Sequence, residues 1–154
     1  MAPERWIDAV VGVMSGIASH RGGKLRVYRV AGKAEIPEGL SEFPCAVIYP
    51  TRIKSAQYSL GGPCKELWEV RGEFYLFPDT KKSNLPELIR YFRKIRDATL
   101  KSMTLGGLVD HFVFSESPME LVSMTYETDG PERHGIVALW EVKEDVTGEI
   151  SAGI

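Results

Sequence analysis

The sequence is short of cysteine and of long apolar runs. Only Cys45 and Cys64 are present, and neither lies in a CxxC pair or near a histidine at metal-ligand spacing. Two thiols are too few for a disulfide scaffold, so we expect reduced cysteines in a cytosolic compartment. The longest apolar run, residues 9–14, is far below the about 20 residues that a membrane helix needs, and early charged residues argue against a signal peptide. We therefore expect a chain without a membrane helix that stays where it is made.

An excess of one charge is also missing. Nineteen Lys and Arg stand against twenty-one Asp and Glu, a net charge of −2, which does not point to nucleic acid or an anionic membrane as a partner. Local charge is uneven: residues 81–101 carry seven basic and two acidic residues (+5), and residues 116–149 carry two basic and nine acidic residues (−7). Such a bipolar chain suits a head-to-tail ring, in which each subunit offers its basic surface to its neighbour's acidic one.

The length of 154 residues suits one domain, and 44% hydrophobic residues are enough to form its core. We expect a single α+β domain over residues 1–146 and a flexible C-terminal tail over residues 147–154. Apolar residues at helical spacing predict amphipathic helices over residues 3–19 and 85–101. Alternation and turn residues predict strands over residues 24–30, 44–50, 67–77, 111–114, 119–126 and 136–142. The expected fold class is α+β, a mainly antiparallel sheet of about five to six strands packed against two amphipathic helices.

Some elements carry residue-level predictions. The prolines at residues 44 and 50 are expected to limit the strand between them. The inner stripe predicted for the first helix is Trp6, Val10, Val13, Met14 and Ile17. The inner stripe predicted for the second helix, after a capping box of Asn84 and Glu87, is Leu85, Leu88, Ile89, Phe92, Ile95 and Thr99. The strand over residues 67–77 is expected to bury one face (Trp68, Val70, Phe74, Leu76) and to wet the other (Glu69, Arg71, Glu73).

The polar segment Thr51–Lys65, with the sequence TRIKSAQYSLGGPCK, is predicted to be a long loop. Long loops in compact domains are usually functional or disordered, so this loop is a candidate functional segment.

Residues that could carry catalysis lack recognisable partners. His20 is expected to cap carbonyls at the end of the first helix, and His111 and His134 are expected to begin strands. No Ser or Cys stands in a nucleophile setting such as GxSxG, and the Gly61-Gly62 and Gly106-Gly107 pairs do not precede a helix as phosphate-binding loops do. We therefore expect no enzyme activity, no catalytic residue, no cofactor and no metal site.

The basic residues of the second helix have three interpretations. Such cations most often form the solvated face of an amphipathic helix. A nucleic-acid module would add an aromatic stacking face, for which Tyr91 alone is insufficient. The third interpretation is the ring interface, whose candidate residues are Arg90, Arg93, Lys94 and Lys101.

The order of these elements resembles a known family. The segments that carry the resemblance are ERWIDAVVGVMSGI, FPCAVIYP, LWEVRGEFYLF, LPELIRYFRKIRDATL, LGGLVDHFVF, MELVSMTYE and RHGIVALWEV. Over about Arg5 to Glu144 the chain is similar to the tail-terminator, or tail-completion, proteins of long-tailed bacteriophages. The resemblance rests on element order and on the late apolar strand that ends in Trp-Glu-Val, without a catalytic signature.

The resemblance implies a structural virion protein, assembled in the host cytoplasm, that forms a ring of six α+β subunits at the head-proximal end of the tail. Such a ring caps the tail tube, stops its polymerisation and offers a docking surface for the head completion or connector protein. DNA would pass through the lumen without sequence-specific binding, and no membrane would take part. In such rings polar loops face the tube, and the matching segment here offers as contact candidates Arg52, Lys54 and Tyr58.

Two alternatives stay open at this point. Element order also fits a head-tail connector or neck protein of the same particles. A different class is a small cytosolic ligand-binding or enzymatic α+β domain, whose apolar pocket would lie between the sheet and the helices. A ring would favour a phage protein, whereas a monomer with a bound metabolite would favour the ligand-binding domain.

Overall fold

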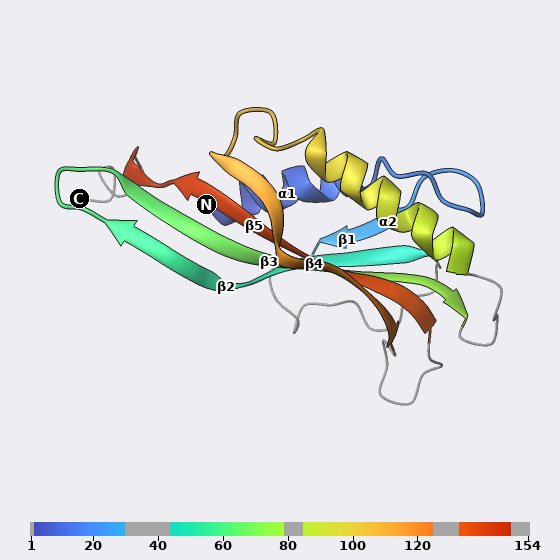
Figure 1. Ribbon diagram of the computed structural model, residues 1–154. Helices are drawn as coiled ribbons and strands as arrows, with labels where there is room; N and C mark the ends of the chain where they lie inside the picture. The colour runs from blue at the N-terminus through green and yellow to red at the C-terminus, as the bar shows by residue number, and fades with distance from the viewer. Residues whose placement is uncertain (1, 30–43, 79–84, 125–132, 149–154) are drawn as a thin grey trace.

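The computed structural model describes residues 2–29, 44–78, 85–124 and 133–148. These residues form, in chain order, α1 (Ala2–Met14), β1 (Arg26–Arg29), β2 (Cys45–Tyr58), β3 (Cys64–Pro78), α2 (Leu85–Leu100), β4 (His111–Met124) and β5 (Arg133–Asp145). The strands make one open sheet in the order β1-β2-β3-β5-β4, antiparallel except for the parallel pair of β1 and β2. Both helices lie on the same side of this sheet (Figure 1). The expected fold class is therefore confirmed.

The two helices cover different parts of the sheet. α1 contacts β1 and β2, whereas α2 contacts β4 and β5. Their apolar faces meet the sheet in one core, in which Trp6, Tyr91, Phe74, Phe112 and Trp140 are among the largest fully buried side chains. No helix of the described ranges is both long enough and apolar enough to cross a bilayer.

Gly72 leaves room for the ring of Trp140, one of the two tryptophans that are fully buried in the core. Trp140 of β5 lies over Gly72 of β3, so closely that a Cβ added at Gly72 would stand 2.6 Å from a ring carbon of Trp140. The Trp140 indole N–H donates to Thr99 Oγ1 on α2 at 3.1 Å. The ring thus fills the space between α2 and the sheet with its polar atom satisfied, which ties α2 to the sheet in one orientation.

α1 is shorter than predicted, because it ends at Met14 and not near residue 19. Gly16 is a poor helix former, and the chain turns back through an isolated bridge between Ala18 and Lys24. Leu25 N–H then donates to the Ile17 carbonyl at 2.8 Å, which leads into β1. The predicted inner stripe is otherwise confirmed, since Trp6, Val10, Met14 and Ile17 are buried and Val13 packs partly buried against the core.

α2 has nearly its predicted bounds, but it is rotated about its axis relative to the predicted stripe. Leu88, Ile95 and Thr99 are buried as predicted and Phe92 is partly buried. Leu85 and Ile89, however, are 51% and 41% exposed, so their predicted burial is wrong. Tyr91 is buried in their place. The apolar arc of this helix is wider than the face that the sheet covers, and packing selects one side of it. Asn84 of the expected capping box lies outside the described residues.

The strands are longer than predicted. β4 joins the two segments predicted over residues 111–114 and 119–126 into one strand, with a register shift between Phe114 and Met119. The predicted stop at Pro50 is also wrong, because β2 continues to Tyr58. Within the described ranges β1 pairs with Cys45–Ile48, so no described strand lies beside Pro50 on that side of β2. Its missing N–H therefore costs no bond to such a neighbour.

Candidate functional site

The predicted loop over Thr51–Lys65 is wrong, because this segment is a β-hairpin. β2 pairs with β3 from Arg52 to Tyr58, with one register shift just before Arg52 and one between Ile53 and Ser55, and a short turn over residues 59–63 joins the two strands. All residues from 51 to 58 are exposed. We call residues 51–69 the hairpin arm. It extends beyond both helices, toward the left of Figure 1. The three candidates of the predicted loop therefore lie on an ordered strand.

The signals for this hairpin were present but were outweighed by polarity. Thr51, Ile53 and Tyr58 favour a strand, and Gly61 adopts a φ of +70° that suits a turn. The polar character of the segment follows from its position, since no described strand lies beyond β2 here and no described helix covers it. A strand that buries neither face needs no apolar alternation, and so it reads as a loop.

Arg52 and Lys54 are held by carboxylates of neighbouring strands. Arg52 lies 3.5 Å from Glu69 of β3, and the Thr51 hydroxyl donates to the same carboxylate at 2.9 Å. Lys54 reaches past β3 to Glu141 of β5 at 2.5 Å. The hydrogen bond to Glu141 and the attraction of that carboxylate raise the pKa of Lys54. Both cations are therefore partly compensated within the chain by cross-strand ion pairs.

Tyr58 lies near the tip and binds a carboxylate that has no cation. Its hydroxyl donates to Glu66 Oε2 at 2.5 Å, and this bond raises the pKa of Tyr58. The Trp68 indole N–H donates to the other carboxylate oxygen of Glu66 at 3.3 Å. Among the described residues no Lys, Arg or His side chain pairs with Glu66. The arm therefore carries one uncompensated negative charge, held by two neutral donors.

The start of β3 is anchored to the end of the domain. Lys65 pairs with Asp110 at 2.6 Å and with Asp145 at 3.3 Å. Cys64 N–H donates to Thr147 Oγ1 at 2.8 Å, and Val146 N–H donates to the Cys64 carbonyl at 2.9 Å. Thr147, the first residue of the expected flexible tail, is thus hydrogen-bonded to β3. Residues 149–154 lie outside the described residues.

The four basic candidates of α2 have different surroundings. Arg90 pairs with Glu87 one turn earlier. Arg93 is exposed, and it has no hydrogen bond or ion pair with any described residue. Lys94 donates to the Ala18 carbonyl at 3.0 Å, and its ammonium lies 4.7 Å from the centre of the Tyr91 ring. Arg93 is therefore available for a partner, whereas Lys94 already joins α2 to the turn after α1.

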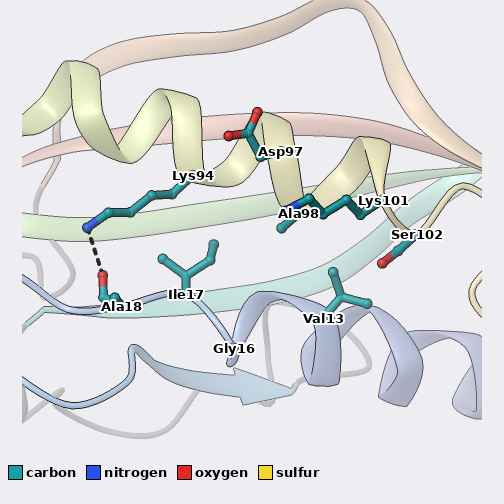
Figure 2. Close-up of a pocket in the computed structure, with 9 residues that line it drawn as sticks. All are labelled: Val13, Gly16, Ile17, Ala18, Lys94, Asp97, Ala98, Lys101 and Ser102. Carbon is teal, nitrogen blue, oxygen red and sulfur yellow. Dashed lines mark hydrogen bonds between the residues drawn. The ribbon is translucent and has the colours of Figure 1, made fainter.

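A groove of about 410 Å³ lies between α2 and the end of α1. Figure 2 shows Val13 and Ile17 on its lower side, and Lys94 bridging one end to Ala18. Lys101, exposed at the end of α2, lies along the upper side with Asp97. The groove is open to solvent and lies between two helices. The ligand-binding alternative expects its pocket between the sheet and the helices.

The acidic part of the chain is less available than its sequence charge indicates. Glu141 and Asp145 pair with lysines of the hairpin arm, and Glu144 is buried. Glu116 and Glu120 of β4 are exposed. The acidic residues between 125 and 132 lie outside the described residues. Part of the negative charge of residues 116–149 is therefore paired with lysines of the hairpin arm in the same chain.

Glu73 is 3% exposed, so its predicted wet position is wrong. Its carboxylate accepts hydrogen bonds from Tyr49 at 2.8 Å, Arg71 at 2.7 Å and Tyr75 at 2.9 Å. Burial raises the pKa of Glu73, but the hydrogen bonds from Arg71 and the two tyrosines outweigh it, so the pKa lies below its ordinary value. Burial and the same carboxylate raise the pKa of both tyrosines. The cluster is a satisfied buried charge, built from residues of β2 and β3 that only the strand register brings together.

His20 does not cap α1, because the helix ends before it. Its ring Nδ1 lies 2.8 Å from the Tyr91 hydroxyl, which also accepts from the His20 N–H at 2.9 Å. The centre of its ring lies 4.4 Å from that of Phe77, and the two rings are tilted by 36°. His111 begins β4 and His134 follows the first residue of β5, as predicted. Where the chain is described, no three His, Cys, Asp or Glu side chains gather in a way that could hold a metal ion.

The surfaces described above are suited to protein contact: a rigid arm, an exposed guanidinium and a shallow groove. Neither the protein-family models nor the curated proteins compared with this chain give a match.

Proposed function

We propose that this chain is a structural protein of a long-tailed bacteriophage, which forms a ring that caps the tail tube. The ring has six subunits, ends tube polymerisation and provides the docking surface for the head connector. It acts by contact alone and uses no cofactor. Its place is the head-proximal end of the tail, after assembly in the host cytoplasm.

The hairpin arm is the observation that carries this proposal. Residues 51–58 of β2 are all exposed, yet this segment pairs with β3 and forms ion pairs with Glu69 and Glu141. A small domain gains little stability from such an extension, since residues 51–58 bury no side chain in the core. An ordered arm of this kind is suited to reach another subunit or the tube. Arg52, Lys54 and Tyr58 remain the candidates for that contact.

Termination then follows from geometry. One face of the ring would match the end of the tube, and the other would lack the surface that a further tube ring needs. A polar, ion-paired contact at the tube suits a surface that must be exposed before assembly. Arg90, Arg93, Lys94 and Lys101 stay candidates for contact between subunits, with Arg93 the least compensated of them.

The first test is the assembly state of the purified chain. Size-exclusion chromatography with light scattering, followed by negative-stain imaging, should give rings of about six subunits with a central hole. Because such proteins can assemble only on the tail, the same measurement is repeated with tail tubes present. A monomer under both conditions would contradict the proposal.

The second test shortens the arm. Residues 56–66 are replaced by a two-residue Asn-Gly turn between Ser55 and Leu67, which pair directly. The replacement removes the buried Cys64 and the ion pairs of Lys65 but none of the main core cluster, so circular dichroism checks that the variant folds. We expect a folded protein that no longer caps tubes, so tube lengths measured by electron microscopy become longer and more variable. The matched control, Arg21→Ala, alters an exposed cation in the turn after α1 and should leave tube lengths unchanged. Tubes of normal length with the shortened arm would refute the proposal.

The alternatives predict different results in the same assays. A neck or connector protein would form a ring but leave tube length unchanged. A ligand-binding domain would stay monomeric and would show a bound metabolite by native mass spectrometry.

A further inference from the structure

The large apolar side chains exposed on the described part of the chain gather in two places. Three are on the hairpin arm: Ile53, Tyr58 and Leu60. Five are on α2, the turn after it and β4: Leu85, Ile89, Leu100, Met103 and Leu121. Leu60 at the tip of the arm is fully exposed. The arm is formed by the end of β2 and the start of β3, whereas α2 packs on β4 and β5. The two apolar sets are therefore separate surfaces.

The exposed set on α2 lies on one flank of the helix. Ile89, Arg93 and Leu100 follow at helical spacing and share this flank, with Leu85 at its start. The opposite flank, with Lys94 and Lys101, faces the groove toward α1. We call the first of these the free flank of α2. It carries the exposed side chains of Leu85, Ile89 and Leu100, the guanidinium of Arg93, which pairs with no described residue, and Arg96, which pairs with Asp97 at 3.0 Å.

The arm carries the matching set. Register places Ile53 opposite Trp68 and Ala56 opposite Glu66, so these side chains share the face of the arm that is turned to the side of the helices. Glu66 on this face accepts hydrogen bonds from Tyr58 and Trp68 but has no cation among the described residues. The arm thus offers apolar side chains around an uncompensated carboxylate, and the free flank offers apolar side chains around an uncompensated guanidinium.

We infer that the hairpin arm of one copy docks on the free flank of α2 of a second copy, with Glu66 facing Arg93. This inference rests on the proposed function and names the contact that would build the ring. The two surfaces are different, because the arm is formed by β2 and β3 whereas the free flank belongs to α2, which packs on β4 and β5. The contact is therefore head-to-tail and can repeat around a closed ring. The charge pair sets register and direction, and the apolar side chains supply the buried area.

Charge exchange tests the contact. Glu66→Arg and Arg93→Glu each place like charges together, and each should weaken assembly at least about tenfold by light scattering over a concentration series. An equal mixture of the two variants should assemble again, because every arm then meets an oppositely charged flank in an alternating ring. The double variant should also assemble. Lys24→Glu, a charge reversal at an exposed residue between α1 and β1 that belongs to neither surface, should assemble as the wild type does.

Circular dichroism and thermal melting report whether each variant folds, and Glu66→Gln replaces Glu66→Arg if the latter does not. Single variants that assemble normally would overturn the inference, as would a mixture that fails to recover or an equal loss in Lys24→Glu. Wild-type chain that stays monomeric, alone and with tail tubes, would overturn both proposals. Rings that cap tubes but ignore these charges would overturn the docking contact alone. Rings that obey the charges but leave tube growth unchanged would overturn the tail function alone.

Discussion

Replacing Glu73 by glutamine should destabilise the fold by about 2–3 kcal/mol at pH 7. The perturbation is small in volume and removes one charge. The carboxylate is buried and accepts hydrogen bonds from Tyr49, Tyr75 and Arg71 at 2.7–2.9 Å. A hydrogen bond to a charged group contributes about 1.5–3 kcal/mol, against about 0.5–1.5 kcal/mol for a neutral one. Three bonds that each weaken by about 1 kcal/mol set the upper end of the expected loss.

Two effects reduce this figure. Arg71 is about one-third exposed, with a relative side-chain accessibility of 35%, so solvent screens part of its attraction to Glu73. Removing the charge also removes the cost of burying it. The expected net loss therefore stays near 2 kcal/mol if the glutamine amide keeps two of the three bonds.

The pH dependence has a definite sign. The folded pKa of Glu73 lies below its unfolded value, so the unfolded chain binds the proton more readily. The stabilisation is fully present above the unfolded pKa of about 4.3 and is lost as the pH falls through the lower folded value. The difference in stability between wild type and Glu73→Gln should therefore be largest at neutral pH and shrink below about pH 4.

Urea unfolding followed by circular dichroism at several pH values measures this difference at fixed protein concentration. The matched control is Glu69→Gln, which removes a carboxylate from the same face of β3 where its partner Arg52 is exposed. It should cost less than about 1 kcal/mol. A Glu73→Gln protein as stable as wild type at pH 7, or a difference that does not change with pH, would show that the cluster contributes no buried charge pair.

Two further predictions concern the core and the groove. Gly72→Ala should cost about 1–3 kcal/mol by urea unfolding, because the new methyl group must displace the ring of Trp140; unchanged stability would mean that the ring moves freely. Lys94→Met should lower the melting temperature measurably, since it removes the bond to the Ala18 carbonyl and the contact with an aromatic ring, whereas Lys101→Met should not; equal effects of the two lysines would contradict the bridging role of Lys94.

Periodicity predicted the helices better than it predicted their buried faces. The bounds of α2 follow from its apolar spacing, and Leu88 and Ile95 are buried as that spacing indicates. Leu85 and Ile89 have the same character and yet are exposed. The apolar arc of α2 is wider than the surface that the sheet covers, so the helix could pack in more than one rotation about its axis. The hydrogen bond from Trp140 to Thr99 selects one of these rotations. Local sequence contains no information on that distant partner.

The candidate site shows the same limit. Polarity identified residues 51–65 as unusual, but it assigned them to a loop, because a strand exposed on both faces lacks apolar alternation. Glu73 was predicted to face solvent because Glu69, Arg71 and Glu73 alternate with apolar residues, which is the pattern of an exposed strand face. Its three donors include Tyr49, which lies 24 residues away along the chain and arrives through the pairing of β2 with β3.

The sequence by itself determined the fold class, the existence of both helices and the unusual polarity of the segment after Pro50. These properties depend on spacing and composition over short windows, which packing rarely overrides. The tertiary structure decided which charged side chains pair within the chain and which have no opposite charge near them among the described residues. Arg52, Lys54 and Lys94 find partners across strands or helices, whereas Arg93 and Glu66 find no opposite charge among the described residues. Charge compensation acts over distances in space, so it becomes visible only after the chain has folded.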